Sequence, residues 1–146
     1  MNTRIVNYLM KQQPEARHFI HFVRHWLNMC GIDFQGYTIA LLVIFYMQSK
    51  LLLPSVKTMQ KDEDRTSLNS TIAGWKTQFD DQKTIYDYGI ELMTNYKNHV
   101  VDFFLLYSEF DFEKMVVFPY YGYSVAKNNP KLQRYNLKYE LYFHFN

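Results

Sequence analysis

Four polar side chains near the start of the chain recur at the spacing of one helix face: Arg17, His21, Arg24 and Asn28. At about 100° per residue they line up along a helix, and we call this line the polar stripe. The opposite face of the same helix is apolar and consists of Phe19, Val23, Trp26, Leu27 and Cys30. Arginine, histidine and asparagine donate hydrogen bonds to phosphate oxygens, and arginine adds a permanent charge. The polar stripe therefore has two interpretations, a phosphate-binding face or a helix face that is only solvated.

Other groupings of reactive side chains are less complete. His18, His21 and His25 share a face, but no further histidine, cysteine or carboxylate pattern completes a zinc site. Asp111 and Glu113 have the alternation that points two carboxylates the same way on a strand, yet no third acid accompanies them. The position of Cys30 on the apolar face predicts a buried, unreactive thiol. These residues form no complete active site, and we expect no metal to be bound by this chain.

Hydrophobic periodicity predicts a mainly α-helical fold that positions the polar stripe. Three helices are expected first, over Thr3 to Lys11, Pro14 to Cys30 and Tyr37 to Gln48, with Gly31 as the stop of the second. A polar, exposed connection is expected from Ser55 to Lys83, anchored at Ile72, Trp75 and Phe79. Helical spacing returns from Tyr86 to Phe110. One or two short β segments are expected near the C-terminus, at Met115 to Phe118 and, more weakly, after Asn128.

Length and composition exclude several protein classes. The 146 residues form one ordinary domain, and a hydrophobic content of 48% excludes a disordered chain. A net charge of +2 predicts no dominating nucleic-acid field, so a basic site must be local. The single cysteine excludes a disulfide framework and suits a reducing intracellular compartment. The longest apolar run, Ile39 to Met47, is shorter than the roughly 20 residues that cross a bilayer, so no membrane partner is expected.

Several short segments also follow one another in a fixed order. They are NTR from Asn2, VRHW from Val23, GI at Gly31, GYTIALLVIFYMQ from Gly36, LLPS from Leu52, GW at Gly74 with Phe79, VDFF from Val101 and YSEFDFE from Tyr107. Together, over about Asn2 to Gly122, they resemble the central helical domain of template-independent RNA nucleotidyltransferases, the family of poly(A) polymerases and terminal uridylyltransferases. Arg24 and the context around Pro54 are similar to the mitochondrial poly(A) polymerase branch.

The resemblance implies roles for five residues. A domain of this family holds a nucleoside triphosphate, ATP or UTP, and the RNA 3′ end opposite a catalytic palm. Asn2 would contact the ribose, Arg24 the triphosphate, and the ring of Tyr37 would stack on the base. Two positions depart from the family pattern, because Asn28 stands in place of a second lysine and Gly36 in place of a serine. Both departures would remove a contact to phosphate.

The resemblance also implies where the chemistry would reside. Two Mg²⁺ ions would be held by three carboxylates of the palm, which would precede Asn2, so Mg²⁺ is expected only through that absent palm and this chain alone is expected to be inactive. Residues 1–122 would be the helical domain and 123–146 a divergent tail. The expected location is intracellular, either cytoplasmic or mitochondrial.

Two alternatives remain open at this point. The chain could be a non-catalytic interaction domain without a palm, whose exposed face is covered by a protein partner. The substitutions at Asn28 and Gly36 favour this alternative. It could also be an unrelated helical domain in which Tyr37 is only a packing residue. Trp26 is expected in the core under every interpretation, because it lies on the apolar face of its helix.

Overall fold

The computed structural model describes residues 3–60, 71–72, 75–76 and 78–133 and is mainly helical, as predicted. Its α-helices are α1 (Thr3–Gln12), α2 (Pro14–Met29), α3 (Gly36–Ser49), α4 (Val56–Met59), α5 (Val100–Ser108) and α6 (Pro130–Gln133). Two 3₁₀ turns span Ile85–Tyr88 and Tyr96–His99. The strands are short antiparallel pairs, β1 (Thr71–Ile72) with β2 (Trp75–Lys76) and β3 (Met115–Val116) with β4 (Val125–Ala126).

The first three helices form where the sequence predicts them. Pro14 occupies the first turn of α2, where its missing N–H group costs little. Gly31 follows α2 with a φ of 71°, a left-handed conformation that glycine adopts without steric strain. These two residues fix where the helix that carries the polar stripe begins and ends.

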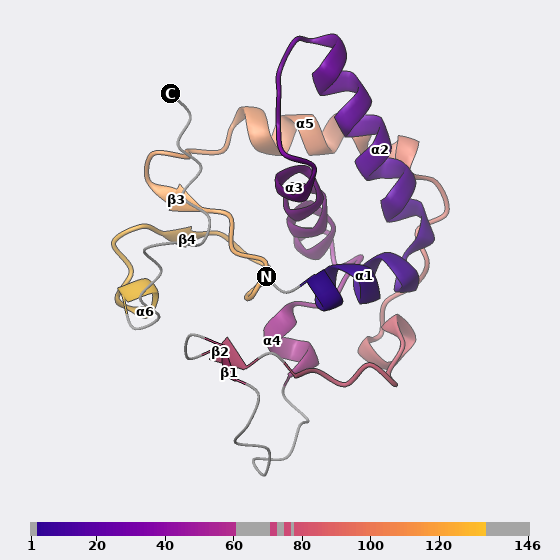
Figure 1. Cartoon of the computed structure of the whole chain (residues 1–146), viewed down its shortest axis with the longest axis vertical. Helices are drawn as coiled ribbons and strands as arrows, with labels where there is room; N and C mark the ends of the chain where they lie inside the picture. Colours follow the sequence, from indigo (N-terminus) through magenta and orange to yellow (C-terminus); the bar gives the residue numbers. More distant parts are fainter. Residues whose placement is uncertain (1–2, 61–70, 73–74, 77, 134–146) are drawn as a thin grey trace.

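Helix α3 is the centre of the molecule, with α2 and α5 beside it (Figure 1). Its residues from Ile39 to Gln48 are all buried, which agrees with the nearly continuous apolar run in the sequence. Aromatic rings join the three helices. Phe19 of α2 contacts Tyr46 of α3 and Phe103 of α5, with ring centroids 5.8 and 5.2 Å apart. Among the described residues, no helix is both long and apolar enough to cross a membrane.

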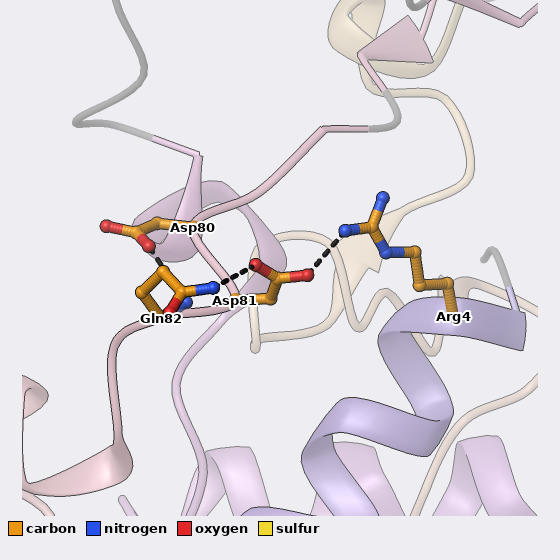
Figure 2. A network of polar contacts seen from close by, with 4 residues as sticks. All are labelled: Arg4, Asp80, Asp81 and Gln82. Atoms are coloured by element: carbon orange, nitrogen blue, oxygen red, sulfur yellow. Dashed lines mark hydrogen bonds and ion pairs between the residues drawn. The ribbon is translucent and has the colours of Figure 1, made fainter.

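Helix α1 anchors the chain where it returns to the core at residues 78–83. Figure 2 shows the Arg4 side chain extending from α1 to the carboxylate of Asp81. The Arg4 guanidinium also lies over the ring of Phe79, which is buried as predicted. The hydroxyl of Tyr8 donates to the backbone carbonyl of Lys83. The hydrogen bond from Arg4 holds the pKa of the Asp81 carboxyl below its usual range.

The prediction of helical structure from Tyr86 to Phe110 is wrong over its first half. Regular helix begins only at Val100, and the preceding residues contain two 3₁₀ turns separated by residues in neither helix nor strand. The side-chain oxygen of Gln13 accepts the N–H of Met93, and Glu15 accepts that of Tyr96. These backbone groups bind side chains of α2 and the residue before it, and so do not form the bonds of a helix ladder.

Three further predictions need correction. The connection expected to be exposed from Ser55 starts with α4, whose residues Val56 and Met59 are buried. Cys30 is exposed, because it is the C-cap residue of α2 and lies beyond the part of the helix that α3 covers. Trp26 is 40% exposed and packs against Phe104 of α5, with ring centroids 4.4 Å apart. Helical periodicity gives the direction of a side chain but not whether another element lies there.

The predicted β segment at Met115 corresponds to β3, which ends after Val116 and pairs with β4. Phe118 is buried but lies outside the strand. The alternating pattern predicted after Asn128 falls largely on residues 134–146, outside the described part of the chain.

Candidate functional site

The polar stripe of α2 lies on the surface along its full length. Arg17, His21, Arg24 and Asn28 are all exposed, while Phe19, Val23 and Leu27 on the opposite face are buried. The helix therefore has the orientation that its amphipathic pattern predicts. Within the part of the chain that the structure describes, none of these four side chains forms an ion pair.

After α2 the connection returns to the start of α3, which lies beside α2 (Figure 1). A Cβ atom built on Gly36, the first residue of α3, would lie 4.0 Å from Nη1 of Arg24. Two of the residues singled out from the sequence are therefore spatial neighbours. Asn28 lies one helical turn beyond Arg24 on the same face of α2.

The first turn of α3 has the chemistry of an anion site. A helix N-terminus carries a partial positive charge and presents backbone N–H groups that lack a partner within the helix. Gln35, the N-cap residue of α3, gives this turn no side-chain hydrogen bond. Arg24 adds a guanidinium charge beside the same turn. Together they offer a fixed charge and backbone donors to one phosphate group.

Tyr37 follows Gly36 in this first turn, and its side chain is 42% exposed. A tyrosine that is this exposed can offer part of its ring to a flat ligand. The structure thus places Arg24 beside Gly36, the chain neighbour of Tyr37, and leaves Asn28 one turn away. Asn2, the fifth residue predicted to bind nucleotide, lies outside the described residues.

Asp111, one of the residues considered for metal binding, has another structural role. The Asp111 carboxylate accepts the backbone N–H groups of Glu113 and Lys114 and forms an ion pair with Lys114 at 3.2 Å. Its contacts with Lys114 lower the pKa of the Asp111 carboxyl. It therefore caps a turn. Over the described residues, no group of three or more His, Cys, Asp or Glu side chains could hold a metal ion.

At Gly36 the family pattern indicates only that a serine contact to phosphate is missing. The helix expected from Tyr37 predicts the terminus of α3, but not the approach of Arg24 to it. The signal for this helix start lies in the sequence, since the polar residues Asp33 and Gln35 give way to a long apolar run just after Gly36.

No protein-family model matches this sequence.

A second surface feature adjoins the C-terminal half of α2. Trp26 and Met29 of α2 and Val101 and Leu105 of α5 are large apolar side chains that are exposed to solvent. Trp26 of α2 contacts the half-buried ring of Phe104 of α5, and this contact joins the two helices. We call these residues the α2–α5 apolar surface. Where exposed apolar side chains adjoin one another in a patch, another protein commonly binds there.

Proposed function

We propose that this chain is the nucleotide-binding helical part of an RNA nucleotidyltransferase, a cytoplasmic or mitochondrial enzyme that adds A or U to RNA 3′ ends. The observation that supports the proposal best is the position of the Arg24 guanidinium against Gly36, the first residue of α3. Two chain segments that resemble this family in sequence meet there and form one anion site. The ordered motifs from Asn2 to Gly122 support it as well.

The contribution of each residue follows from its chemistry. The guanidinium of Arg24 offers a planar pair of N–H donors to triphosphate oxygens, and the N-terminus of α3 adds backbone donors to the same charge. The ring of Tyr37 stacks on the base, which favours no particular base because every base has a π-face. This site binds and orients a nucleotide.

Magnesium would supply the phosphoryl-transfer chemistry of such an enzyme. The described residues do not bring together the carboxylates that would hold it. The nearest candidate in the sequence, Asp111, is engaged by Lys114 and by backbone N–H groups. We therefore assign no catalytic step to these residues, and the proposal concerns nucleotide binding.

Titration calorimetry with ATP and with UTP tests the proposal. We expect millimolar or tighter binding that is abolished or weakened at least tenfold in Arg24→Ala and in Tyr37→Ala. Matched controls are Lys97→Ala and Tyr86→Ala, which remove an exposed cation and an exposed tyrosine elsewhere on the surface. Absence of binding by the unmodified chain, or equal losses in the controls, would overturn the proposal.

A second candidate function is a non-catalytic domain that binds a protein partner. The specific observation that favours it is the α2–α5 apolar surface, and the departures from the family pattern at Asn28 and Gly36 agree with it. It predicts that the chain associates with itself or another protein, and that Leu105→Glu prevents this association. Light scattering that shows a monomer at all concentrations, with no binding of an apolar dye, would count against it.

A further inference from the structure

Two tyrosine rings are stacked in the connection between β3 and β4. The rings of Tyr121 and Tyr123 are 5.2 Å apart between centroids and inclined by only 14°. Tyr123 is 53% exposed, so its ring is accessible from solvent. The ammonium group of Lys57, from α4, lies over the ring of Tyr121 at 5.0 Å from its centroid. We call these three residues the aromatic platform.

The fold holds the aromatic platform in place through backbone contacts. The N–H of Lys57 donates to the carbonyl of Tyr120 at 2.9 Å, so α4 and the platform segment are directly joined. The buried side chain of Gln48 in α3 donates to the carbonyl of Pro119 at 3.0 Å. Gly122 has a φ of 75°, and a Cβ there would approach Ser55 to 3.3 Å. The turn that pairs the two rings is therefore bonded to α3 and α4 and favours glycine at position 122.

In the amino-acid sequence, the segment that contains the two tyrosines of the aromatic platform is basic. Positions 114 to 139 contain five basic residues and no acidic one: Lys114, Lys127, Lys131, Arg134 and Lys138. Residues 114–146 carry 5 − 1 = +4, whereas residues 1–113 carry 11 − 13 = −2, and the sum is the net charge of +2. Basic residues interspersed with tyrosines are typical of segments that bind single-stranded nucleic acid.

We propose that the aromatic platform binds an unpaired stretch of RNA, with a base stacked on Tyr123 and a flanking phosphate close to Lys57. An exposed ring that is already stacked on a second ring is preorganised for a third flat partner. The positive charge of Lys57 beside the stack, together with the absence of acidic residues from positions 114 to 139 of the sequence, suits the phosphates of a strand better than an acidic or apolar peptide. The inference rests on the proposed function in selecting RNA, and it assigns the strand to a surface separate from Arg24 and Tyr37.

Fluorescence anisotropy of the full chain with labelled 15-nucleotide oligo(U) and oligo(A) tests this inference. We expect Tyr123→Ala to weaken binding by about 5- to 100-fold, the range found for loss of one base stack, and Tyr123→Phe to retain binding because the ring remains. Lys57→Ala should weaken binding and reduce the slope of log affinity against log salt by about one. Tyr86→Ala and Lys97→Ala serve as matched controls and should stay within twofold of the unmodified chain.

Absence of RNA binding, equal losses in the controls, or equal affinity for a 15-base-pair RNA duplex would overturn the inference. Circular dichroism and the melting temperature of each variant show that the fold is retained, and retention of binding by Tyr123→Phe guards against a structural effect. Nucleotide titrations of the same variants separate the two proposals. Tyr123→Ala should bind ATP or UTP normally, and Arg24→Ala should bind RNA within threefold of the unmodified chain. Loss of both ligands on either substitution would contradict the assignment of separate surfaces.

Discussion

The guanidinium of Arg24 in α2 lies against Gly36, the residue at which α3 begins, with Nη1 4.0 Å from the position of a Cβ. Arg24 of α2 is therefore a close neighbour of the N-terminus of α3. A substitution at either residue therefore acts on the same small volume of surface. The distance is an ordinary van der Waals contact, so a small side chain at position 36 fits without moving Arg24.

Gly36→Ser is expected to increase nucleotide affinity. The added hydroxyl would enter the space beside Arg24 and give a phosphate oxygen one more donor, for a gain of about 3- to 10-fold. Asn28→Lys should act in the same direction, because it adds a positive charge one turn from Arg24, and its effect should diminish at high salt. Titration calorimetry with ATP and UTP at two salt concentrations measures both changes.

The control for the added charge is Asn98→Lys, which places the same group on an exposed 3₁₀ turn. It should leave nucleotide affinity within twofold. If Gly36→Ser and Asn28→Lys lower affinity, or if Asn98→Lys raises it equally, then the space between α2 and the start of α3 is not where phosphate binds.

The sequence predicts well those helices whose ends and buried faces are determined by residues of the same segment. Pro14, Gly31 and the apolar run of α3 determine helix ends and faces within their own segments. The exposure of the polar stripe follows in the same way from the burial of Phe19 and Val23 opposite it. The approach of Arg24 to Gly36 depends on the path of a connecting loop, and spacing alone does not define that path.

The features that the sequence does not predict depend on contacts between residues far apart in the chain. Residues 90–96 follow helical spacing in the sequence, but Gln13 and Glu15 bind their backbone groups from a segment about eighty positions earlier. Similarly, Lys57 meets Tyr121 only because α4 bonds to the carbonyl of Tyr120. For the aromatic platform the sequence contains one signal, since positions 114–139 have no acidic residue. This signal indicates a positively charged segment, whereas the stacking of the two rings is seen only in the folded structure.

Gln13 is expected to be critical for stability. Its side chain is fully buried, donates to the carbonyls of Leu52 and Glu91 and accepts the N–H of Met93. Gln13→Leu would remove the side-chain partner of one buried and two partly buried backbone groups, at a cost on the order of 3 kcal/mol of unfolding free energy. Chemical denaturation followed by circular dichroism measures the loss. Gln82→Leu, at an exposed position, should change stability by less than about 0.5 kcal/mol.

The Cys30 thiol is expected to react in the native protein. It is exposed at the C-cap of α2, so a thiol reagent should label it without denaturant. Cys30→Ser should change the unfolding free energy by less than about 0.5 kcal/mol. Labelling that requires denaturant would show instead that the thiol is buried, as its position on the apolar face of the helix first suggests.

Two buried tyrosines are expected to make the fold sensitive to alkaline pH. Burial raises the pKa of Tyr8 to about 12, with smaller contributions from Tyr88 and from nearby carboxylates, and burial together with the carboxylate of Asp102 raises the pKa of Tyr46 to about 12. An unfolded tyrosine titrates near 10.0. Between these values the unfolded chain releases protons that the folded chain retains, so the unfolding free energy falls as pH rises.

This contribution to stability is fully present below pH 10 and is lost progressively toward pH 12. Tyr46→Phe and Tyr8→Phe each remove one such proton, so each variant should show a shallower decline in stability over this interval than the unmodified chain. The comparison uses slopes, since Tyr46→Phe also removes the hydrogen bond to Nδ1 of His99 and lowers stability at every pH. Urea unfolding at half-unit steps from pH 9 to 12 measures the slopes, with exposed Tyr86→Phe as the control. Slopes in Tyr8→Phe and Tyr46→Phe that equal those of the control would show that both hydroxyls lose their protons as readily in the folded chain as in the unfolded one.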